Sequence, residues 1–288
     1  MAQSTIVDDD SIQWVNGADY LETLEPHFRE NLGPKDQVEE NFAKYWQKTL
    51  YLDPQSSRRL DLIRFDPDYH DLTHCYHDSV EECLVLEGSV QIDGEGLFRA
   101  GDYFWRPPGW VHMGASAEGG RVLLGFEGES DESGRVSRYV SPPGDAGANA
   151  LYPDGDERSL GARGRVLQVH TGQLVWQPGP GFARSEGPLD AFDLDHVSVR
   201  VLSKNLHNGK QTLLLRLEPG YRQSARGSHS VRLQAYVIDG ALALGERRLE
   251  AGAFLDRPGG AIEEPLESPG GALLYAKVDG WLDYVPAA

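Results

Sequence analysis

Sulfur-containing residues are scarce in this chain, whose 288 residues include two cysteines and two methionines. Two cysteines cannot build a framework of several disulfides, so the disulfide-rich class of small secreted folds is excluded. The two residues are Cys75 and Cys83. Cys83 follows Glu81 by two positions in a strand-like pattern, and we expect it to be a small buried residue of the core.

Positive charge and long apolar runs are also in short supply. The chain has 27 Lys and Arg against 45 Asp and Glu, which gives a net charge of -18. Phosphate groups would be repelled, which argues against nucleic acid or an anionic membrane as a partner. No apolar stretch reaches about 18 residues, and the initial MAQSTIVDDD lacks a basic and then apolar leader. We therefore expect a soluble, cytoplasmic protein.

The chain contains an internal duplication. At an offset of 152 residues, the stretch from Lys48 to His77 aligns with the stretch from Arg200 to His229. One residue is then dropped and the offset becomes 151. At these offsets Pro67, Tyr69, His77, Gly88, Gly101, Arg106, Pro107 and Gly109 match Pro219, Tyr221, His229, Gly240, Gly252, Arg257, Pro258 and Gly260. A repeat of this length indicates two copies of one domain, which also suits a chain of 288 residues.

Both halves carry the signals of short β-strands. Residues 59–65 and 211–217 are largely apolar and end at Asp66-Pro67 and Glu218-Pro219, as strands that lead into turns do. Residues 82–88 predict a further strand closed by Gly88, and residues 92–98 predict a glycine-containing hairpin. Strands and turns at this spacing predict an all-β fold, either a sandwich or a barrel.

One stretch of the first half concentrates residues that bind metals. It reads Cys75-x-His77-x-x-x-Glu81 with Gly88, and then Gly101, Pro107, Gly109 and His112. Residues two apart on a strand share a face, so positions 75 and 77 point the same way, and Glu81 returns to that face after a turn. The rigid turn at 106–109 directs His112 toward the same cavity. Two imidazoles and a carboxylate in one interior predict a divalent metal site.

These motifs resemble those of the cupin family. The second cupin motif is complete in Gly101, Pro107, Gly109 and His112, whereas the first has Cys75 where the family places its first metal-binding His. The resemblance implies two tandem jelly-roll (cupin) β-barrels with a short helical N-terminal arm, that is, a bicupin. The sequence is also similar to the cupin half of zinc-containing anti-sigma factors.

Cys75 leaves three alternatives for the metal site. It is a thiolate ligand, or a small residue beside a three-ligand site, or it lies at a bulge that lets His74 replace it. The set His77, Glu81 and His112 alone would form the two-His, one-carboxylate face that suits non-haem Fe(II) and oxygen. We expect one divalent metal ion per chain and favour Fe(II), although Zn, Mn and Ni accept the same donors.

The duplication indicates a division of roles between the halves. The positions equivalent to Cys75, His77, Glu81 and His112 are Gly227, His229, Leu233 and Glu263, so we expect the second barrel to hold no metal. Residues 17–47 show helical spacing and are expected to pack on the outside of the barrel or on the second subunit of a homodimer. Residues 166–169 and 174–178 are expected to open the second barrel. The expected regions are an arm (1–47), a metal-binding barrel (48–130), a linker (131–164) and a degenerate barrel (165–288).

The resemblance leaves the reaction open, because cupins carry out many. We favour a non-haem Fe(II) dioxygenase that acts on a small enolisable or phenolic compound, with Glu81, Arg106 and Tyr69 as candidate catalytic residues. Arg106 and Tyr69 could anchor a carboxylate or an enolate, but both recur in the second half, which favours a structural role. The alternatives are a redox-neutral metal-dependent isomerase or lyase and a non-catalytic small-molecule sensor.

Overall fold

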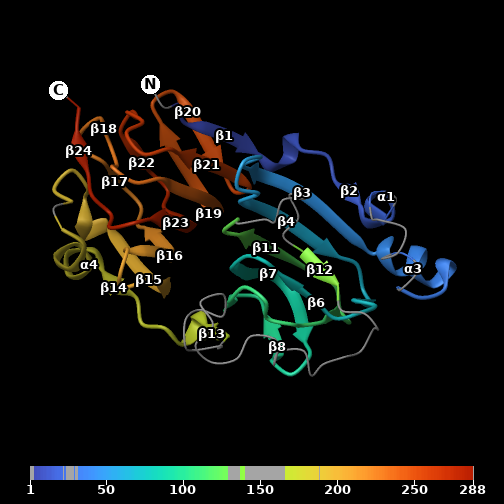
Figure 1. The fold of residues 1–288 in the computed structure, drawn as a ribbon. Helices are drawn as coiled ribbons and strands as arrows, with labels where there is room; N and C mark the ends of the chain where they lie inside the picture. Colours follow the sequence, from blue (N-terminus) through green and yellow to red (C-terminus); the bar gives the residue numbers. More distant parts are fainter. Residues whose placement is uncertain are drawn as a thin grey trace. The chain divides into compact units, whose positions relative to one another are not determined.

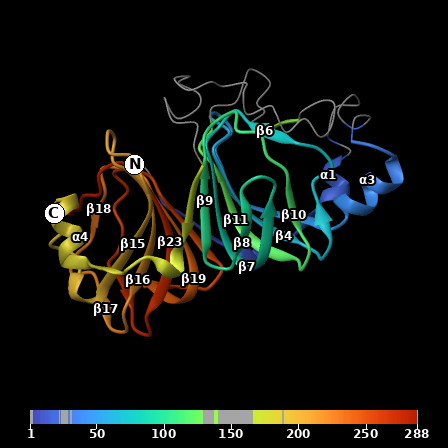
Figure 2. The same ribbon diagram turned by 90° about the horizontal axis from the view of Figure 1, so that it is seen from below.

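The computed structural model describes residues 3–21, 23, 29, 32–128, 137–139, 166–187 and 189–287. The chain divides into two compact units, residues 12–172 and residues 1–11 with 173–288. We call these the first barrel and the second barrel. Each has an antiparallel sheet of ten strands, and the strands of each curve around an interior (Figures 1 and 2). The expected all-β fold of two jelly-roll barrels is confirmed.

The main sheet of the first barrel has the strand order β13-β9-β7-β11-β4-β3-β2. Its core includes Ile63, Val85, Phe98 and Phe104, together with Cys83, which is 2% exposed as expected. The described elements of this barrel are β2 (Val15–Asn16), α1 (Gly17–Leu21), α3 (Lys35–Phe42), β3 (Tyr45–Leu52), β4 (Arg59–Phe65), β5 (Tyr69–His70), β6 (Cys75–His77), β7 (Glu81–Ile92), β8 (Gly96–Arg99), β9 (Asp102–Arg106), β10 (Gly114–Ser116), β11 (Gly120–Phe126), β12 (Ser137–Tyr139), β13 (Leu167–His170) and η4 (Thr171–Gln173).

The second barrel repeats this architecture, with the order β1-β21-β19-β23-β16-β15-β14. Leu213, Ala276 and Val278 lie in one of its apolar clusters. Its elements are β1 (Thr5–Asp8), η1 (Asp9–Ser11), β14 (Gln177–Pro178), α4 (Gly179–Glu186), η5 (Leu194–His196), β15 (Val197–Lys204), β16 (Lys210–Leu217), β17 (Tyr221–Arg222), β18 (Gly227–Ser228), β19 (Leu233–Leu244), β20 (Arg247–Glu250), β21 (Ala253–Arg257), β22 (Leu266–Ser268), β23 (Ala272–Asp279) and β24 (Val285–Pro286).

The strand boundaries confirm the duplication. Strand β7 and its counterpart β19 start and end 152 residues apart, and β9 and β21 start and end 151 residues apart. Gly88 and Gly240 have φ angles of 66° and 77°, and a Cβ atom at these positions would lie 2.1 and 2.2 Å from the carbonyl oxygens of Gly119 and Gly271. Glycine is therefore required at both positions. The expected end of the strand at Gly88 is wrong, because β7 continues through this glycine to Ile92.

The repeat also extends toward the N-terminus, at a different offset. Strands β1 and β13, and the first residues of α1 and α4, are 162 residues apart. Trp14 and Trp176 match at this offset, and each indole lies under two cationic side chains, which are Lys48 and Arg64 for Trp14 and Arg200 and Arg216 for Trp176. The change of offset from 152 to 162 means that the first barrel has ten additional residues before β3. Helix α3 lies in this longer stretch.

The edge strands β1 and β13 are exchanged between the repeats. Strand β13 precedes the second barrel in sequence but pairs with β9 of the first, with Leu167 opposite Trp105 and His170 opposite Asp102. Strand β1 pairs with β21 of the second barrel. The expectation that residues 166–169 open the second barrel is therefore wrong, since a strand pattern does not specify which sheet edge accepts the strand.

Three other expectations on the connections can be compared with the structure. Residues 174–178 contain β14, which pairs with β15 of the second barrel as expected. The helical pattern of residues 17–47 corresponds to α1 and α3, although β3 already begins at Tyr45. Most of the expected linker 131–164 lies outside the described residues, and the described part, β12, pairs with β6.

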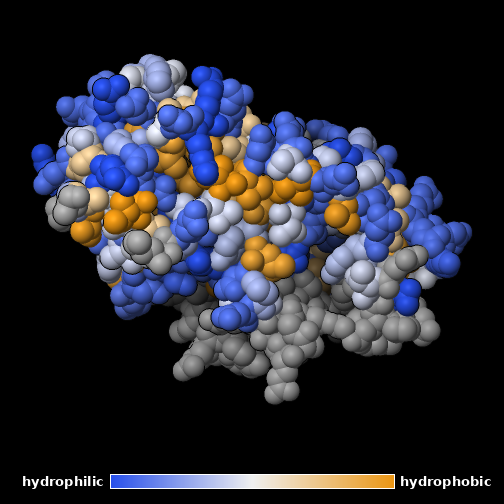
Figure 3. All heavy atoms as spheres, turned by 90° about the horizontal axis from the view of Figure 1, so that it is seen from above, coloured by the Kyte–Doolittle hydropathy of each residue, from blue (hydrophilic) through white to orange (hydrophobic). Residues whose placement is uncertain are grey.

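The visible face of the molecule is largely polar. In the view of Figure 3, polar residues cover much of the outer surface, with apolar residues between them. Within the described ranges, no helix is long and apolar enough to cross a membrane.

Candidate metal centre

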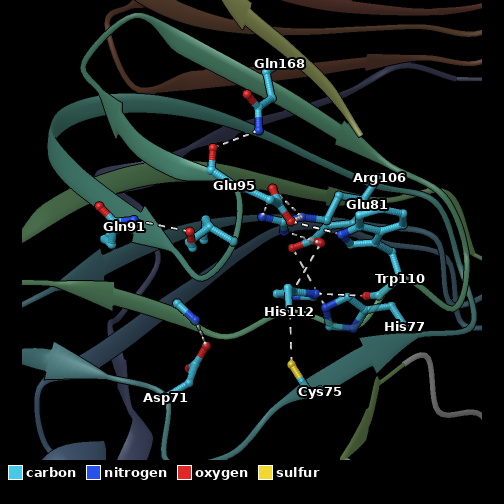
Figure 4. Close-up of polar contacts among 12 residues, drawn as sticks. Asp71, Cys75, His77, Glu81, Gln91, Glu95, Arg106, Trp110, His112 and Gln168 are labelled. Atoms are coloured by element: carbon cyan, nitrogen blue, oxygen red, sulfur yellow. Dashed lines mark hydrogen bonds and ion pairs between the residues drawn. The ribbon is translucent and has the colours of Figure 1, made fainter. Parts of the chain in front are cut away.

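Backbone pairing brings the two sequence motifs together inside the first barrel. Cys75 and His112 form an antiparallel bridge, in which each amide donates to the other's carbonyl oxygen at 2.9 Å. The amide of Gly109 donates to the carbonyl oxygen of His77 at 2.8 Å. As a result the side chains of Cys75, His77, Glu81 and His112 converge (Figure 4). The convergence predicted from strand alternation is present in the structure.

The donor atoms are close enough to share one ion. Glu81 Oε1 lies 3.8 Å from His77 Nε2, and Glu81 Oε2 lies 3.7 Å from His112 Nε2. Cys75 Sγ lies 3.8 Å from His112 Nε2, and one donor atom from each of Cys75, His77 and His112 lies within 4.8 Å of the others. Two nitrogen or oxygen donors bound to one ion at about 2.1 Å each are at most about 4.2 Å apart. The residues therefore fit a bound cation.

The orientation of His112 suits metal binding. Its Nδ1 lies 3.1 Å from the carbonyl oxygen of Trp110 and can only donate to it, which leaves Nε2 as the lone-pair donor. The ring of His77 packs against the ring of Phe126 at a centroid distance of 4.7 Å. Both imidazoles are thus held by their surroundings before any ion binds.

Burial and neighbouring charges set the protonation states that ligands need. Burial lowers the pKa of His112 to about 3, helped by the Arg106 guanidinium, and burial also lowers the pKa of His77. Burial alone would raise the pKa of Glu81, but Arg106 and the two imidazoles outweigh it and lower this pKa to about 2. At neutral pH the centre therefore presents two neutral imidazoles and one carboxylate.

Arg106 is buried and joins two carboxylates. Its Nη1 donates to Glu81 at 2.7 Å, and its Nε and Nη2 donate to Glu95 at 3.0 and 3.1 Å. Trp110 Nε1 also donates to Glu95, at 3.1 Å. One guanidinium and two carboxylates leave a net charge of -1, which favours a cation nearby. Arg106 is directed at Glu81 and Glu95, so we assign it a positioning role and not a direct one in chemistry.

The geometry distinguishes between Cys75 and His74. Cys75 lies in the donor group, although burial raises the pKa of its thiol well above the usual value, so that it stays protonated without an adjacent cation. His74 Nε2 instead lies 3.3 Å from Asp93 Oδ2, and among the described residues His74 forms no hydrogen bond or ion pair with Cys75, His77, Glu81 or His112. The described geometry therefore favours Cys75 over His74 as the residue beside the two imidazoles.

A cavity of about 190 Å³ lies beside the candidate ligands, and Cys75, His77, Glu81 and His112 form part of its lining. Tyr69 and Phe104 line it, so Phe104 belongs both to the core and to the cavity wall. Tyr20, Leu32 and Phe42 also line it. The segment before β3, expected to pack on the outside of the barrel or on a second subunit, also contributes a wall of the cavity.

Several polar residues of the cavity were not singled out from the sequence. Asp71 accepts hydrogen bonds from Tyr69 Oη at 2.7 Å and from the amide of Gly114 at 2.6 Å. Arg59 is held through its Nε by Asp61, which is 1% exposed. The pattern Arg59-x-Asp61 on an apolar strand could have predicted this ion pair. Residues two apart on a strand share a face, and a buried charge is stable only when an opposite charge is paired with it. Glu95 lies in the turn between β7 and β8, and no sequence signal links it to Arg106.

The second barrel lacks this arrangement at the equivalent positions. His229 Nδ1 donates to the carbonyl oxygen of Asp283. A Cβ atom on Gly227 would lie 2.4 Å from Cζ of Tyr284, so this ring fills the place that corresponds to the Cys75 side chain. Leu233 replaces the carboxylate of Glu81. The donor groups found among the described residues do not include His229 or Glu263.

Solved structures with the same fold are distant in sequence. A candidate dioxygenase from Nostoc punctiforme aligns over 100% of this chain and 87% of its own, with a TM-score of 0.72 and 14% identity. The E. coli protein Ylba aligns over 96% and 91%, with a TM-score of 0.56 and 14% identity. Oxalate decarboxylase from Bacillus subtilis aligns over 99% and 79%, with a TM-score of 0.52 and 15% identity. These likenesses show the cupin fold.

Sequence comparison adds the family. No curated protein is detectably similar to the chain. The model of the family described as "Domain of unknown function (DUF4437)" matches residues 45–285. This match covers most of both barrels, and the chain belongs to that family.

Proposed function

We propose that the first barrel is a metal-dependent enzyme and that its reaction is the oxygenation of a small enolisable or phenolic compound by non-haem iron. One observation carries the proposal: two neutral imidazole nitrogens each lie within 3.8 Å of an oxygen of the same ionised carboxylate, next to a cavity. His77, Glu81 and His112 would hold the ion. Bound Fe(II) would supply the activation of oxygen and open positions for substrate.

The protein's own residues would orient the substrate and protect the site. Arg106 keeps Glu81 ionised and in place through the 2.7 Å hydrogen bond. Asp61 holds Nε of Arg59, and no partner for the Nη groups of Arg59 is found among the described residues. These Nη groups could donate to an anionic oxygen of the substrate. Phe104 and Phe126 line the cavity, and such apolar walls exclude water from it.

The comparisons support the class of reaction without defining it. The protein from Nostoc punctiforme is named as a candidate dioxygenase, whereas the Bacillus subtilis protein is an oxalate decarboxylase. One fold therefore serves different reactions.

A redox-neutral isomerase or lyase is the second candidate, and Cys75 favours it. A thiolate beside two imidazoles is a donor set typical of zinc, which acts as a Lewis acid on a carbonyl group. A zinc site of this kind would also suit the alternative of a non-catalytic small-molecule sensor.

Oxygen uptake by the iron-loaded full chain would test the proposal. We expect uptake with at least one compound of a panel of β-diketones and phenols, loss of uptake in His77→Ala, and retention in the matched second-barrel variant His229→Ala. No uptake with iron, combined with turnover of the same compounds by the zinc or manganese form, would replace the dioxygenase with a redox-neutral enzyme. Equal loss in His229→Ala would remove the assignment to the first barrel.

A further inference from the structure

The second barrel contains a buried arginine for which no counter-ion is found among the described residues. Arg257 ends β21 as Arg106 ends β9, and it is 6% exposed. Its Nε and Nη2 atoms are buried and have no hydrogen-bond partner among the residues that the structure describes. No ion pair of this guanidinium is found in the part of the chain that the structure describes. A buried charge of this kind is costly unless something neutralises it.

Comparison with Arg106, the equivalent residue of the first barrel, shows which partners Arg257 does not have. Arg106 donates to two carboxylates, Glu81 and Glu95. In the second barrel Leu233 takes the place of Glu81, and the turn between β19 and β20 is one residue shorter than the turn that carries Glu95. Glu246 in the shorter turn is exposed. Neither carboxylate partner therefore has a replacement at the equivalent position among the described residues.

The hydroxyl of Tyr221 is a second hydrogen-bond donor near Arg257 whose counterpart in the first barrel has a partner. Tyr221 is equivalent to Tyr69, whose hydroxyl donates to Asp71. Gln223 takes the place of Asp71, and its amide is turned to Ala225 and Tyr284. Tyr221 is 3% exposed, and its hydroxyl has no hydrogen bond to any described residue. Arg257 lies near enough to favour the ionised form of this phenol, although burial raises its pKa overall.

Two titratable groups near Arg257 are held by other partners. Glu263 contributes to the potential at Arg257, but its Oε1 accepts a hydrogen bond from Ser4 and it forms no ion pair with Arg257 among the described residues. His229 is held by the carbonyl oxygen of Asp283 and stacks on Phe192 at a centroid distance of 6.0 Å. Phe192 also packs against the cluster that contains Tyr221, so the faces of two aromatic rings lie in the same region as the two donors.

We propose that the second barrel binds a small organic carboxylate, which accepts hydrogen bonds from the Arg257 guanidinium and the Tyr221 hydroxyl. The ligand replaces the carboxylates that the first barrel supplies from Glu81, Glu95 and Asp71. A guanidinium fork matches the planar carboxylate in geometry and charge. A doubly charged phosphate fits less well, because one arginine faces it and Glu263 lies in the vicinity. This site does not depend on the metal or on the reaction of the first barrel.

The test is calorimetric titration of the full chain with acetate and benzoate at constant ionic strength, with acetamide, benzamide, chloride and inorganic phosphate as controls. We expect binding of at least one carboxylate and an increase of Tm with its concentration, with no effect of the amides. Arg257→Met should weaken this binding at least tenfold, and Tyr221→Phe should weaken it severalfold. Arg248→Met, at an exposed arginine of the second barrel, should leave it unchanged.

A second pair of variants makes the test independent of whether Arg257→Met folds. Leu233→Glu returns an internal carboxylate to Arg257, so it should raise Tm without ligand and abolish carboxylate binding, whereas the neutral Leu233→Gln should retain binding. The proposal is overturned if no carboxylate binds the wild type, if Leu233→Glu binds as well as Leu233→Gln, or if phosphate or chloride binds as tightly as the carboxylates.

Discussion

The two barrels have the same backbone architecture but differ in the side chains of their interiors. Strands β7 and β19 match residue for residue, and Gly88 and Gly240 have the same conformation against the same neighbouring carbonyl. The interior positions Asp71, Cys75, Glu81 and His112 of the first barrel are Gln223, Gly227, Leu233 and Glu263 in the second. A few inward-facing side chains therefore distinguish the candidate metal centre of the first barrel from the equivalent positions of the second, where the described residues do not form such a donor group. The turns and the core preserve the fold in both.

We expect the largest difference in stability between variants of the two buried arginines, Arg106 and Arg257. Arg106→Met leaves Glu81 and Glu95 buried without their cation and should lower the free energy of unfolding by about 3–5 kcal/mol. Arg257→Met removes a charge that has no partner and should leave this free energy unchanged or raise it. Urea denaturation followed by tryptophan fluorescence measures both. Equal losses in the two variants would contradict the assignment of different roles.

The conserved backbone geometry predicts equal effects at the two paired glycines. Gly88→Ala and Gly240→Ala each place a residue with a side chain at a positive φ, which costs about 1–3 kcal/mol, and add a Cβ atom that clashes with the facing carbonyl oxygen. Both variants should lose stability by similar amounts in thermal denaturation. A large loss in one barrel only would show that the repeats are not equivalent at this turn.

A smaller effect distinguishes Cys75 from its counterpart Gly227. Gly227→Ala forces the ring of Tyr284 aside and should cost about 1 kcal/mol or more of stability without altering metal content. Cys75→Ala removes a sulfur donor and should lower metal affinity while the fold is retained. Chemical denaturation and equilibrium dialysis of the metal check the pair. Unchanged metal affinity in Cys75→Ala would leave three ligands, His77, Glu81 and His112.

The sequence was sufficient to predict the repeat, the strands and the candidate ligands, for a physical reason. Glycine and proline mark turns at fixed offsets, and alternation on a strand determines which side chains share a face. Gly101, Pro107, Gly109 and His112 are therefore recognisable in a single sequence. Cys75 could be placed on the inward face, but whether it or His74 pointed inward depended on backbone pairing with His112.

Long-range partners could not be predicted in the same way. The strand pattern of residues 166–169 was visible, but its pairing with β9 depends on which sheet edge is open. In the sequence Glu95 is an ordinary turn residue, but in the structure its carboxylate accepts hydrogen bonds from Arg106. The lining of the cavity by Leu32 and Phe42 likewise depends on how the ten additional residues before β3 fold.

The central claim is that one cation is held in the first barrel by His77, Glu81 and His112. Elemental analysis of the full chain, purified without added metal, tests it most directly when His77→Ala and His229→Ala are analysed beside the wild type. We predict one divalent metal ion per chain in the wild type and in His229→Ala, and loss of the ion in His77→Ala. The same metal content in all three proteins would contradict the claim.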